Sequence, residues 1–332
     1  MPALLGWAAV LAALLLQPSG PVALAAILTV IVLCSFGVMQ RANALARRLG
    51  EPYGALVLTF AITAIEIILV ASVFLGDQPN PGVARDSTFS ASMLLLNLVM
   101  GAAFLIGGLR HRRLAINGAG VSQYLVMLLV VGGAAFALPV LLAAPPSRAM
   151  QTAIAVLMLL TYGVFLHRQL GANRADFADA SPETATDEPA LPNAVWLIAT
   201  IAPIVVLGQV MTPMFTELLP RPELAGLLIA VVILLPETFT TLSAGWSGQG
   251  QRVANLTLGA LVSVVGVTVP VVLLLAAATG READFVLSGA ELTLLGMTLG
   301  LSTLTATARQ ATALHGVGHL AVFAMYVMVL VA

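Results

Sequence analysis

Long apolar runs, separated by short polar or Pro/Gly-containing segments, restrict the fold of this chain more than any other feature. Each is long enough, or nearly so, to cross a bilayer, which takes about 20 helical residues. They lie at residues 3–16, 20–40, 52–76, 86–109, 120–143, 149–168, 193–213, 223–246, 252–279, 284–306 and 311–331. Only helices satisfy the backbone within such runs in lipid. The sequence therefore predicts an all-α polytopic membrane protein with about eleven transmembrane helices.

The composition agrees with a membrane protein and excludes several other classes. Of the 332 residues, 60% are hydrophobic and only 9% are charged, against about 25% charged in soluble domains. The net charge of -1 and the scattered arginines offer no surface for nucleic acid. Cys34 is the single cysteine, which excludes an intrachain disulfide and a Cys-based metal site. The first run lacks a basic n-region and an A-x-A cleavage site, so it predicts a short helix and not a signal peptide.

The arginines predict an orientation, because cytoplasmic segments of membrane proteins are enriched in basic residues. If the segment between the second and third helices is cytoplasmic, that side holds Arg41, Arg47, Arg48, Arg110, Arg112, Arg113, Arg168, Arg174, Arg252 and Arg309. The other side holds Arg85, Arg148, Arg221 and Arg281. We therefore expect a cytoplasmic N-terminus and an external C-terminus.

One connection is much more polar than the others and divides the chain. Residues 171 to 193 contain Asp176, Asp179, Glu183, Asp187 and Glu188. A flexible acidic linker is the expectation, with a cation-sensing or recruiting role as the alternative. The predicted parts are an extra N-terminal helix (1–19), a five-helix set (20–168), an acidic cytoplasmic linker (169–192) and a second five-helix set (193–332). An odd number of spans per set makes the second set enter from the opposite side, the inverted-repeat architecture of many secondary transporters.

Two isolated acids lie at matching depths in the two sets. Glu66, in "LTFAITAIEIILV", follows Gly20 by 46 residues, and Glu237, in "ILLPETFTT", follows Asn193 by 44. Ionisable groups at this depth are unfavourable in lipid, so they face a cavity or a partner. A neutral acid hydrogen-bonded to a neighbouring helix is the structural alternative. The symmetric pairing favours a cation-binding or proton-binding site.

Polar neighbours accompany both acids. Thr59 and Thr63 share a helix face with Glu66, and Thr240 and Thr241 share one with Glu237. Oxygen ligands of this kind suit a hard cation, although threonines also bond their own helix backbone. Pro236 leaves the carbonyl four residues earlier without its donor, so that oxygen is a further candidate ligand.

Four more polar residues lie inside predicted spans. Asn97 and Ser263 lie deep in the helices that follow the two acids, where they are candidates to line the site. His315 and His319 are four apart on the last helix. Packing, a proton relay and a shared metal are the alternatives for this pair, and no third ligand accompanies it.

Several long segments resemble the bacterial calcium/proton antiporters, most of all the branch also credited with sodium and potassium/proton exchange. They are "RRLGEPYGALVLTFAITAIEIILVASV", "ARDSTFSASMLLLNLVMGAAFLIGGLRHR", "LLPETFTTLSAGWSGQGQRVANLTLGALVSVVGVTVPVV" and "HGVGHLAVFAMY". The resemblance implies a member of the calcium:cation antiporter superfamily in the bacterial inner membrane. It places the family's two essential glutamates on Glu66 and Glu237. Calcium/proton exchangers commonly carry Asn or Gln at the places of Leu95 and Ser263, so the choice among Ca2+, Na+ and K+ stays open.

The predicted function is the export of a metal cation in exchange for protons, by alternating access around the two glutamates. Ca2+ is the first choice of ion, with Na+ and K+ as alternatives. No resident cofactor is expected, and the partners are the lipid bilayer and the transported ions. A cation channel and an intramembrane hydrolase are the rival functions, although "GWSGQG" is too incomplete to supply a serine nucleophile motif. A carrier of organic cations is a further rival. The oligomeric state is not predicted.

Overall fold

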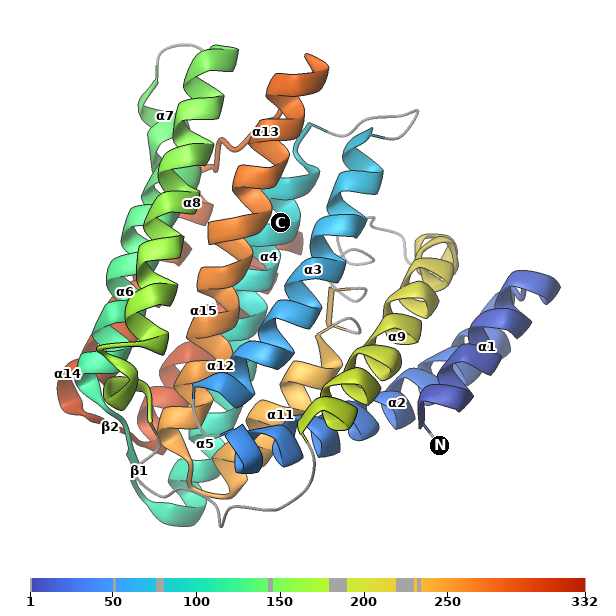
Figure 1. The fold of residues 1–332 in the computed structure, drawn as a ribbon, viewed down its shortest axis with the longest axis horizontal. Coiled ribbons are helices and arrows are strands. Elements are labelled where there is room, and N and C mark those ends of the chain that lie inside the picture. Colours follow the sequence, from blue (N-terminus) through green and yellow to red (C-terminus); the bar gives the residue numbers. More distant parts are fainter. Residues whose placement is uncertain are drawn as a thin grey trace.

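Helices make up nearly all of the computed structural model, which describes residues 2–49, 52–75, 81–142, 146–178, 190–218, 230–231 and 234–331 (Figure 1). The first half contains α1 (Pro2–Leu16), α2 (Gly20–Leu49), α3 (Tyr53–Leu75), α4 (Val83–Met93), π-helix η1 (Leu94–Val99), α5 (Met100–His111), α6 (Gly118–Gly132), π-helix η2 (Gly133–Ala137), α7 (Leu138–Leu141), α8 (Arg148–Leu170) and 3-10 helix η3 (Arg174–Phe177). The second contains α9 (Ala190–Leu218), α11 (Leu235–Trp246), α12 (Gly250–Ser263), π-helix η4 (Val264–Thr268), α13 (Val269–Thr279), α14 (Gly289–Ala308) and α15 (Ala313–Val331). The predicted all-α fold is confirmed.

Several helices are continuous through a π-helix, and these form the longest rods. Within the described residues, seven rods are long and apolar enough to cross a membrane: Gly20–Leu49, Ala84–His111, Gly118–Leu141, Arg148–Leu170, Leu191–Met211, Gly250–Thr279 and Ala313–Val331. α1 is a shorter apolar helix. Of the run predicted at 223–246, the described helix covers α11 alone. The protein is an integral membrane protein.

The centre of the bundle is built from the second and third spans of each half. These are α3 and the rod Ala84–His111 in the first half, and α11 and the rod Gly250–Thr279 in the second. The rods Ala84–His111 and Gly250–Thr279 are each 72% buried along their most apolar window, whereas the other spanning rods are 22–50% buried. α3 packs against α12, and α11 packs against α5 and α12 (Figure 1). α2 and α9, the first helices of the two halves, pack against each other at one flank, with α1 beside them. Each half thus supplies helices to a shared centre.

A short β-pairing connects the two halves at one end of the bundle. β1 (Leu114–Ala115) pairs antiparallel with β2 (Gln310–Ala311), and both lie at the lower end in Figure 1. β1 follows α5, the end of the third span of the first half. β2 follows α14, the fourth span of the second half. Each span carries the chain to the other end of the bundle, so a connection after a third span and one after a fourth span lie at the same end only when the two halves run in opposite directions. The pairing is the one that an inverted repeat requires.

The connection after α8 differs in part from the flexible linker expected there. Phe177 is fully buried, and its carbonyl oxygen accepts a hydrogen bond from Asn255 Nδ2 at 2.7 Å. Asp176 accepts one from Gln123 Nε2 at 2.8 Å. The expectation of flexibility is wrong for residues 171–178, because a buried aromatic ring anchors them. The other four acids of the connection lie outside the described residues.

Candidate functional site

Glu66 occupies the middle of α3, a mostly apolar helix that contacts the opposite half through α12. Its side chain is half-buried. Ser87, in the first turns of α4, donates a hydrogen bond from Oγ to Glu66 Oε1 at 3.4 Å. The first acid is therefore held between two consecutive helices of its own half. Ser87 was not among the predicted site residues.

Glu237 lies in the first turn of α11, directly after Pro236. Proline is favourable at the start of a helix, where its missing N–H would have no partner. The positive end of the helix dipole faces a carboxylate in the first turn and partly offsets the burial of its charge. The side chain is only 2% exposed, and Oε2 has no hydrogen-bond partner within the described residues. The carbonyl predicted to be freed by Pro236, at residue 232, lies outside the described residues.

The two acids come from different halves, and the helices that carry them, α3 and α11, both pack against α12. Burial disfavours the charged form of a carboxyl group, and a neighbouring like charge disfavours it further. The negative charges of the two glutamates are therefore unfavourable here unless protons or a bound cation neutralise them.

A chain of hydroxyl groups crosses between the halves beside the acids. Thr63 Oγ1 donates to Ser263 Oγ at 3.2 Å, and Tyr162 OH donates to the same oxygen at 3.1 Å. Ser263 is the last residue of α12, and Tyr162 belongs to α8. The structure thus brings the predicted residues Thr63 and Ser263 into contact. Tyr162 was missed, because a single tyrosine in an apolar helix carries no sequence signal for a site.

The other three predicted threonines are buried but bonded differently. Thr240 Oγ1 donates to the Pro236 carbonyl of its own helix at 2.8 Å, which is the backbone bonding that threonine often adopts. Thr241 Oγ1 is buried without a partner in the described part of the chain. Thr59 is 2% exposed and lies one turn before Thr63 on α3. Of the two predicted threonines near Glu237, Thr241 is therefore the one whose hydroxyl group is left without a hydrogen bond.

Asn97 belongs to a second polar cluster. Its Nδ2 donates to Thr298 Oγ1 at 2.8 Å, and its Oδ1 lies 3.1 Å from His319 Nδ1. Nothing among the hydrogen bonds of the described residues joins Asn97 to either acid. Leu95, on the same π-helix, is also buried and apolar. Neither of these two positions, as the structure describes them, brings an amide to the glutamates.

The two predicted histidines do not share a ligand. His315 Nδ1 lies 2.9 Å from Thr312 Oγ1 near the start of α15, whereas His319 is fully buried against Asn97. His319 Nε2 has no partner in the described structure. No cluster of three or more His, Cys, Asp or Glu side chains suited to a metal occurs within the described residues. The contacts of His315 and His319 are those of packing and hydrogen bonding, and the shared-metal alternative gains no support.

Each acid is followed, one helix later, by a π-helix. η1 begins 28 residues after Glu66, and η4 begins 27 residues after Glu237. π-Helices inside longer helices are rare and occur frequently at functional sites. Neither was expected from the sequence, but their matched positions repeat the pairing of the acids.

The helical membrane bundle with an acid from each half among its central helices has the construction of a secondary transporter. The chain belongs to the sodium/calcium exchanger protein family, which it matches over residues 19–171 and 192–332. It is 30% identical over 313 residues to the sodium-potassium/proton antiporter ChaA of Escherichia coli (strain K12), covering 90% of this chain and 86% of that one. The protein is thus a cation antiporter of the calcium:cation antiporter superfamily.

Solved structures share the fold at lower sequence identity. The structure of native YfkE has a TM-score of 0.71 at 16% identity and covers all of both chains. A structure of the sodium-calcium exchanger NCX_Mj has a TM-score of 0.64 at 16% identity, covering 90% of this chain and 94% of that one. The family is one of exchangers and the E. coli relative is an antiporter, not an enzyme, so the hydrolase alternative is set aside.

Proposed function

We propose that this antiporter exchanges protons for a metal cation at a site formed by Glu66 and Glu237. One observation carries the proposal: α3 with Glu66 and α11 with Glu237 both pack against α12, and the buried Glu237 Oε2 is without a hydrogen-bond partner among the described residues. Thr241 and the hydroxyl chain through Ser263 supply further oxygen atoms. This is a ligand set for a hard cation.

Exchange follows from competition for the same oxygen atoms. Protons neutralise the two carboxyl groups when no cation is present, and a bound cation replaces them because it also offsets the buried negative charge. A carrier that changes its accessible side only when loaded moves the two species in opposite directions. Two carboxyl groups release at most two protons per cycle.

Na+ or K+ is the first choice of ion in this proposal, ahead of the Ca2+ that the sequence favoured. The side-chain amide that the sequence offered for the site, Asn97, is bonded to Thr298 and His319, so carboxylate and hydroxyl oxygens remain as the candidate ligands. The E. coli relative named above is a sodium-potassium/proton antiporter. Ca2+ is the second candidate, because two carboxylates balance a divalent charge and the family is described as sodium/calcium exchangers.

The proposed cycle uses the two halves, 20–168 and 193–332, as inverted repeats around the central rods. Support comes from the family match, which covers the two halves as separate segments, and from the β1–β2 pairing at one end. With a cytoplasmic N-terminus and an inward proton-motive force, the cation is exported. The remaining helices move around the site as the carrier changes sides.

The test is cation-induced proton movement in everted membrane vesicles with a pH-sensitive dye. Na+, K+ and Ca2+ are added in turn to vesicles with a preset proton gradient. We expect rapid dissipation with Na+ or K+ and loss of that response in both Glu66→Gln and Glu237→Gln. The matched control is Glu291→Gln, because Glu291 caps α14 in a capping box with Ser288 and Gln preserves this motif.

The outcomes separate the claims. A response to Ca2+ alone would change the assigned ion from Na+ or K+ to Ca2+ but would leave the assignment of the site intact. Full exchange in both glutamine variants would overturn the site, and equal loss in Glu291→Gln would show that the assay reports misfolding. Cation flux that is indifferent to the proton gradient would overturn proton coupling.

A further inference from the structure

The connection between α13 and α14, residues 280–288, belongs to the second half but binds the helices that hold Glu66. Arg281 Nη1 donates to the carbonyl oxygen of Phe74, in the last turn of α3, at 2.8 Å. Asp284 Oδ2 accepts from Arg85 Nη1, in the first turn of α4, at 2.6 Å. One connection therefore joins the end of α3 and the start of α4.

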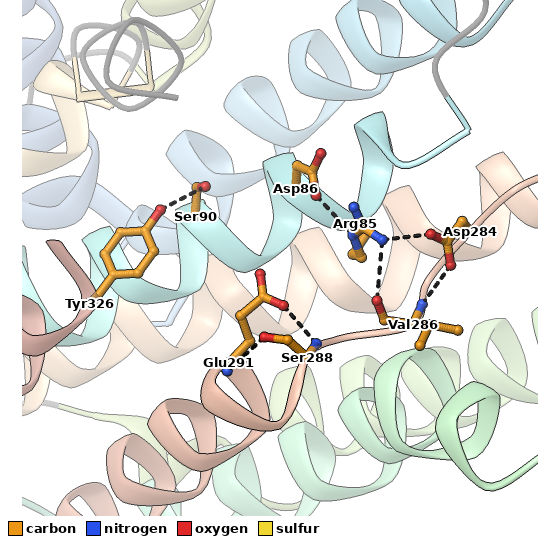
Figure 2. A network of polar contacts seen from close by, with 8 residues as sticks. All are labelled: Arg85, Asp86, Ser90, Asp284, Val286, Ser288, Glu291 and Tyr326. Atoms are coloured by element: carbon orange, nitrogen blue, oxygen red, sulfur yellow. Dashed lines mark hydrogen bonds and ion pairs between the residues drawn. The ribbon is translucent and has the colours of Figure 1, made fainter. Parts of the chain in front are cut away.

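Arg85 is the centre of this contact, as Figure 2 shows. Besides Asp284 it binds Asp86 Oδ1 through Nε at 2.8 Å and the Val286 carbonyl oxygen through Nη1 at 3.2 Å. Asp284 Oδ1 accepts from the Val286 N–H at 2.9 Å, which fixes its orientation. The side chains of Arg85 and Asp284 are 24% and 45% exposed. Water screens an ion pair of this exposure, so the contact is weak enough to break and re-form.

This contact lies next to the candidate site along both helices. Ser87, the hydrogen-bond donor to Glu66, is two residues after Arg85 in α4. Phe74 follows Glu66 by eight residues in α3, about 12 Å along a helix. Separating the connection from α3 and α4 would therefore free the two helices on which Glu66 and its partner lie.

The opposite end repeats the same contacts with the halves exchanged. His111 Nε2 donates to the carbonyl oxygen of Trp246, the last residue of α11, at 2.8 Å. The backbone N–H of Asn117 donates to Gln251 Oε1, in the first turn of α12, at 2.8 Å. Here the last residue of α5 and the connection that follows it join the end of the helix that carries Glu237 to the start of the next one.

The two ends differ in strength. At the Trp246 end the Arg110 guanidinium lies over the indole ring, 4.2 Å from its centroid, and the β1–β2 pairing reinforces the contacts there. Gly250, the first residue of α12, lies so close to the Ala115 carbonyl that a Cβ atom would be 2.5 Å from it. The Arg85–Asp284 end has no β-pairing within the described residues. The ion pair is therefore the contact that yields more easily.

We propose that the connection 280–288 is the gate over one mouth of the cation pathway and that the Arg85–Asp284 ion pair is its latch. With the pair formed, α3 and α4 are held together at this end and water reaches Ser87 slowly. With the pair broken, the mouth opens and Ser87 becomes accessible. The proposal rests on Glu66 being part of the cation site, and Arg85 and Asp284 act as positioning residues.

The test measures how fast a reporter cysteine is labelled. Ser87→Cys is made in a Cys34→Ala background, and the purified full chain is treated with a small water-soluble methanethiosulfonate. Asp284→Asn should raise the labelling rate about fivefold, the factor for losing a partly exposed ion pair. Asp86→Asn is the matched control, since it removes the same charge from Arg85 but no contact between the halves, and should leave the rate unchanged.

A second measurement separates a latch from a general structural role. Choline chloride screens the ion pair without adding a metal ion, so it should speed labelling in the parent protein and have little effect in Asp284→Asn. Ser122→Cys, exposed on α6, should be labelled at one rate in all backgrounds. Arg85→Gln should reproduce the effect of Asp284→Asn.

Unchanged labelling of Ser87→Cys in both Asp284→Asn and Arg85→Gln would overturn the gate. So would an equal increase in Asp86→Asn. Because labelling needs no transport, the gate can fail while proton-coupled exchange persists in vesicles. Equally, exchange can be absent while the ion pair still controls access to Ser87.

Discussion

Thr241 is the residue whose chemistry separates a cation site most clearly from ordinary packing. Its hydroxyl oxygen is buried and without a partner in the described part of the chain. Replacing an unsatisfied buried hydroxyl with a methyl group of the same shape is neutral or stabilising. We predict that Thr241→Val keeps or raises the thermal unfolding temperature, while the KM for the transported cation rises about tenfold, as for the loss of one ligand of about 1.4 kcal/mol.

The control for this substitution is Thr257→Val. Thr257 is equally buried, but its Oγ1 donates to the Val253 carbonyl of its own helix at 2.9 Å. Its removal should leave the KM unchanged. A Thr241→Val variant with unaltered KM would remove this hydroxyl from the site.

The sequence identified the acids but not all of their partners. Glu66 and Glu237 stood out because a carboxylate in an apolar run is unfavourable and therefore rare. Thr63 and Ser263 were both candidates, yet their contact joins residues 200 positions apart, and only tertiary packing determines it. Asn97 lies on the expected helix, but Thr298 and His319 bind its amide. Both partners lie in the last two helices, and no local pattern predicts their approach.

At the scale of elements, α11 approaches α5 through glycine. A Cβ atom on Gly245 would lie 2.6 Å from the Ala103 carbonyl oxygen and 3.0 Å from its Cα, and this backbone cannot move aside without shifting α5. Small residues permit such close approaches between membrane helices. We predict that Gly245→Ala destabilises the protein by about 1–3 kcal/mol and reduces exchange, because α11 carries Glu237. Thermal unfolding of the purified protein and vesicle transport measure the two effects.

Gly300→Ala is the comparison for this prediction. A Cβ atom at Gly300 on α14 would meet nothing within 4 Å, so alanine should preserve transport and stabilise the helix by about 0.5–1 kcal/mol. Equal unfolding temperatures for Gly245→Ala and Gly300→Ala would contradict the role of the close approach.

The helices were the most predictable elements, since uninterrupted apolar runs specify them directly. Hydropathy does not distinguish α from π hydrogen bonding, so the π-helices Leu94–Val99 and Val264–Thr268 were not expected. The connection after α8 carried a misleading signal: its acids indicated a flexible linker, but Phe177 inserts among the rings of Tyr124 and Phe165. One aromatic residue outweighs the polar composition around it.

For the whole molecule, competition between protons and cations predicts how affinity changes with pH. Lower pH favours the protonated acids, so more cation is needed to displace the protons. We predict that the KM for the transported cation rises as pH falls, by up to about tenfold per pH unit for each competing proton. Initial exchange rates at several pH values in the same vesicles measure this dependence. A KM that is constant across pH would contradict a shared site.

The architecture of the whole molecule was predictable as far as the number and order of the apolar runs determine it. Apart from the extra N-terminal run, five runs on each side of the acidic connection predicted halves of opposite direction, and the matching offsets of Glu66 and Glu237 predicted their convergence. The contacts that couple the halves were not predictable. Arg85 was assigned only to one side of the membrane, whereas its partner Asp284 is 199 residues away.

Proton coupling through the two glutamates is the central claim, and purified protein in liposomes tests it most directly. Liposomes with an internal pH dye are loaded with Na+, K+ or Ca2+ and diluted into cation-free choline buffer. Outward movement of the transported cation should acidify the interior of liposomes that contain the parent protein. Liposomes that contain Glu66→Gln or Glu237→Gln should show no acidification. Cation efflux without acidification, or acidification that persists in both variants, would contradict the account.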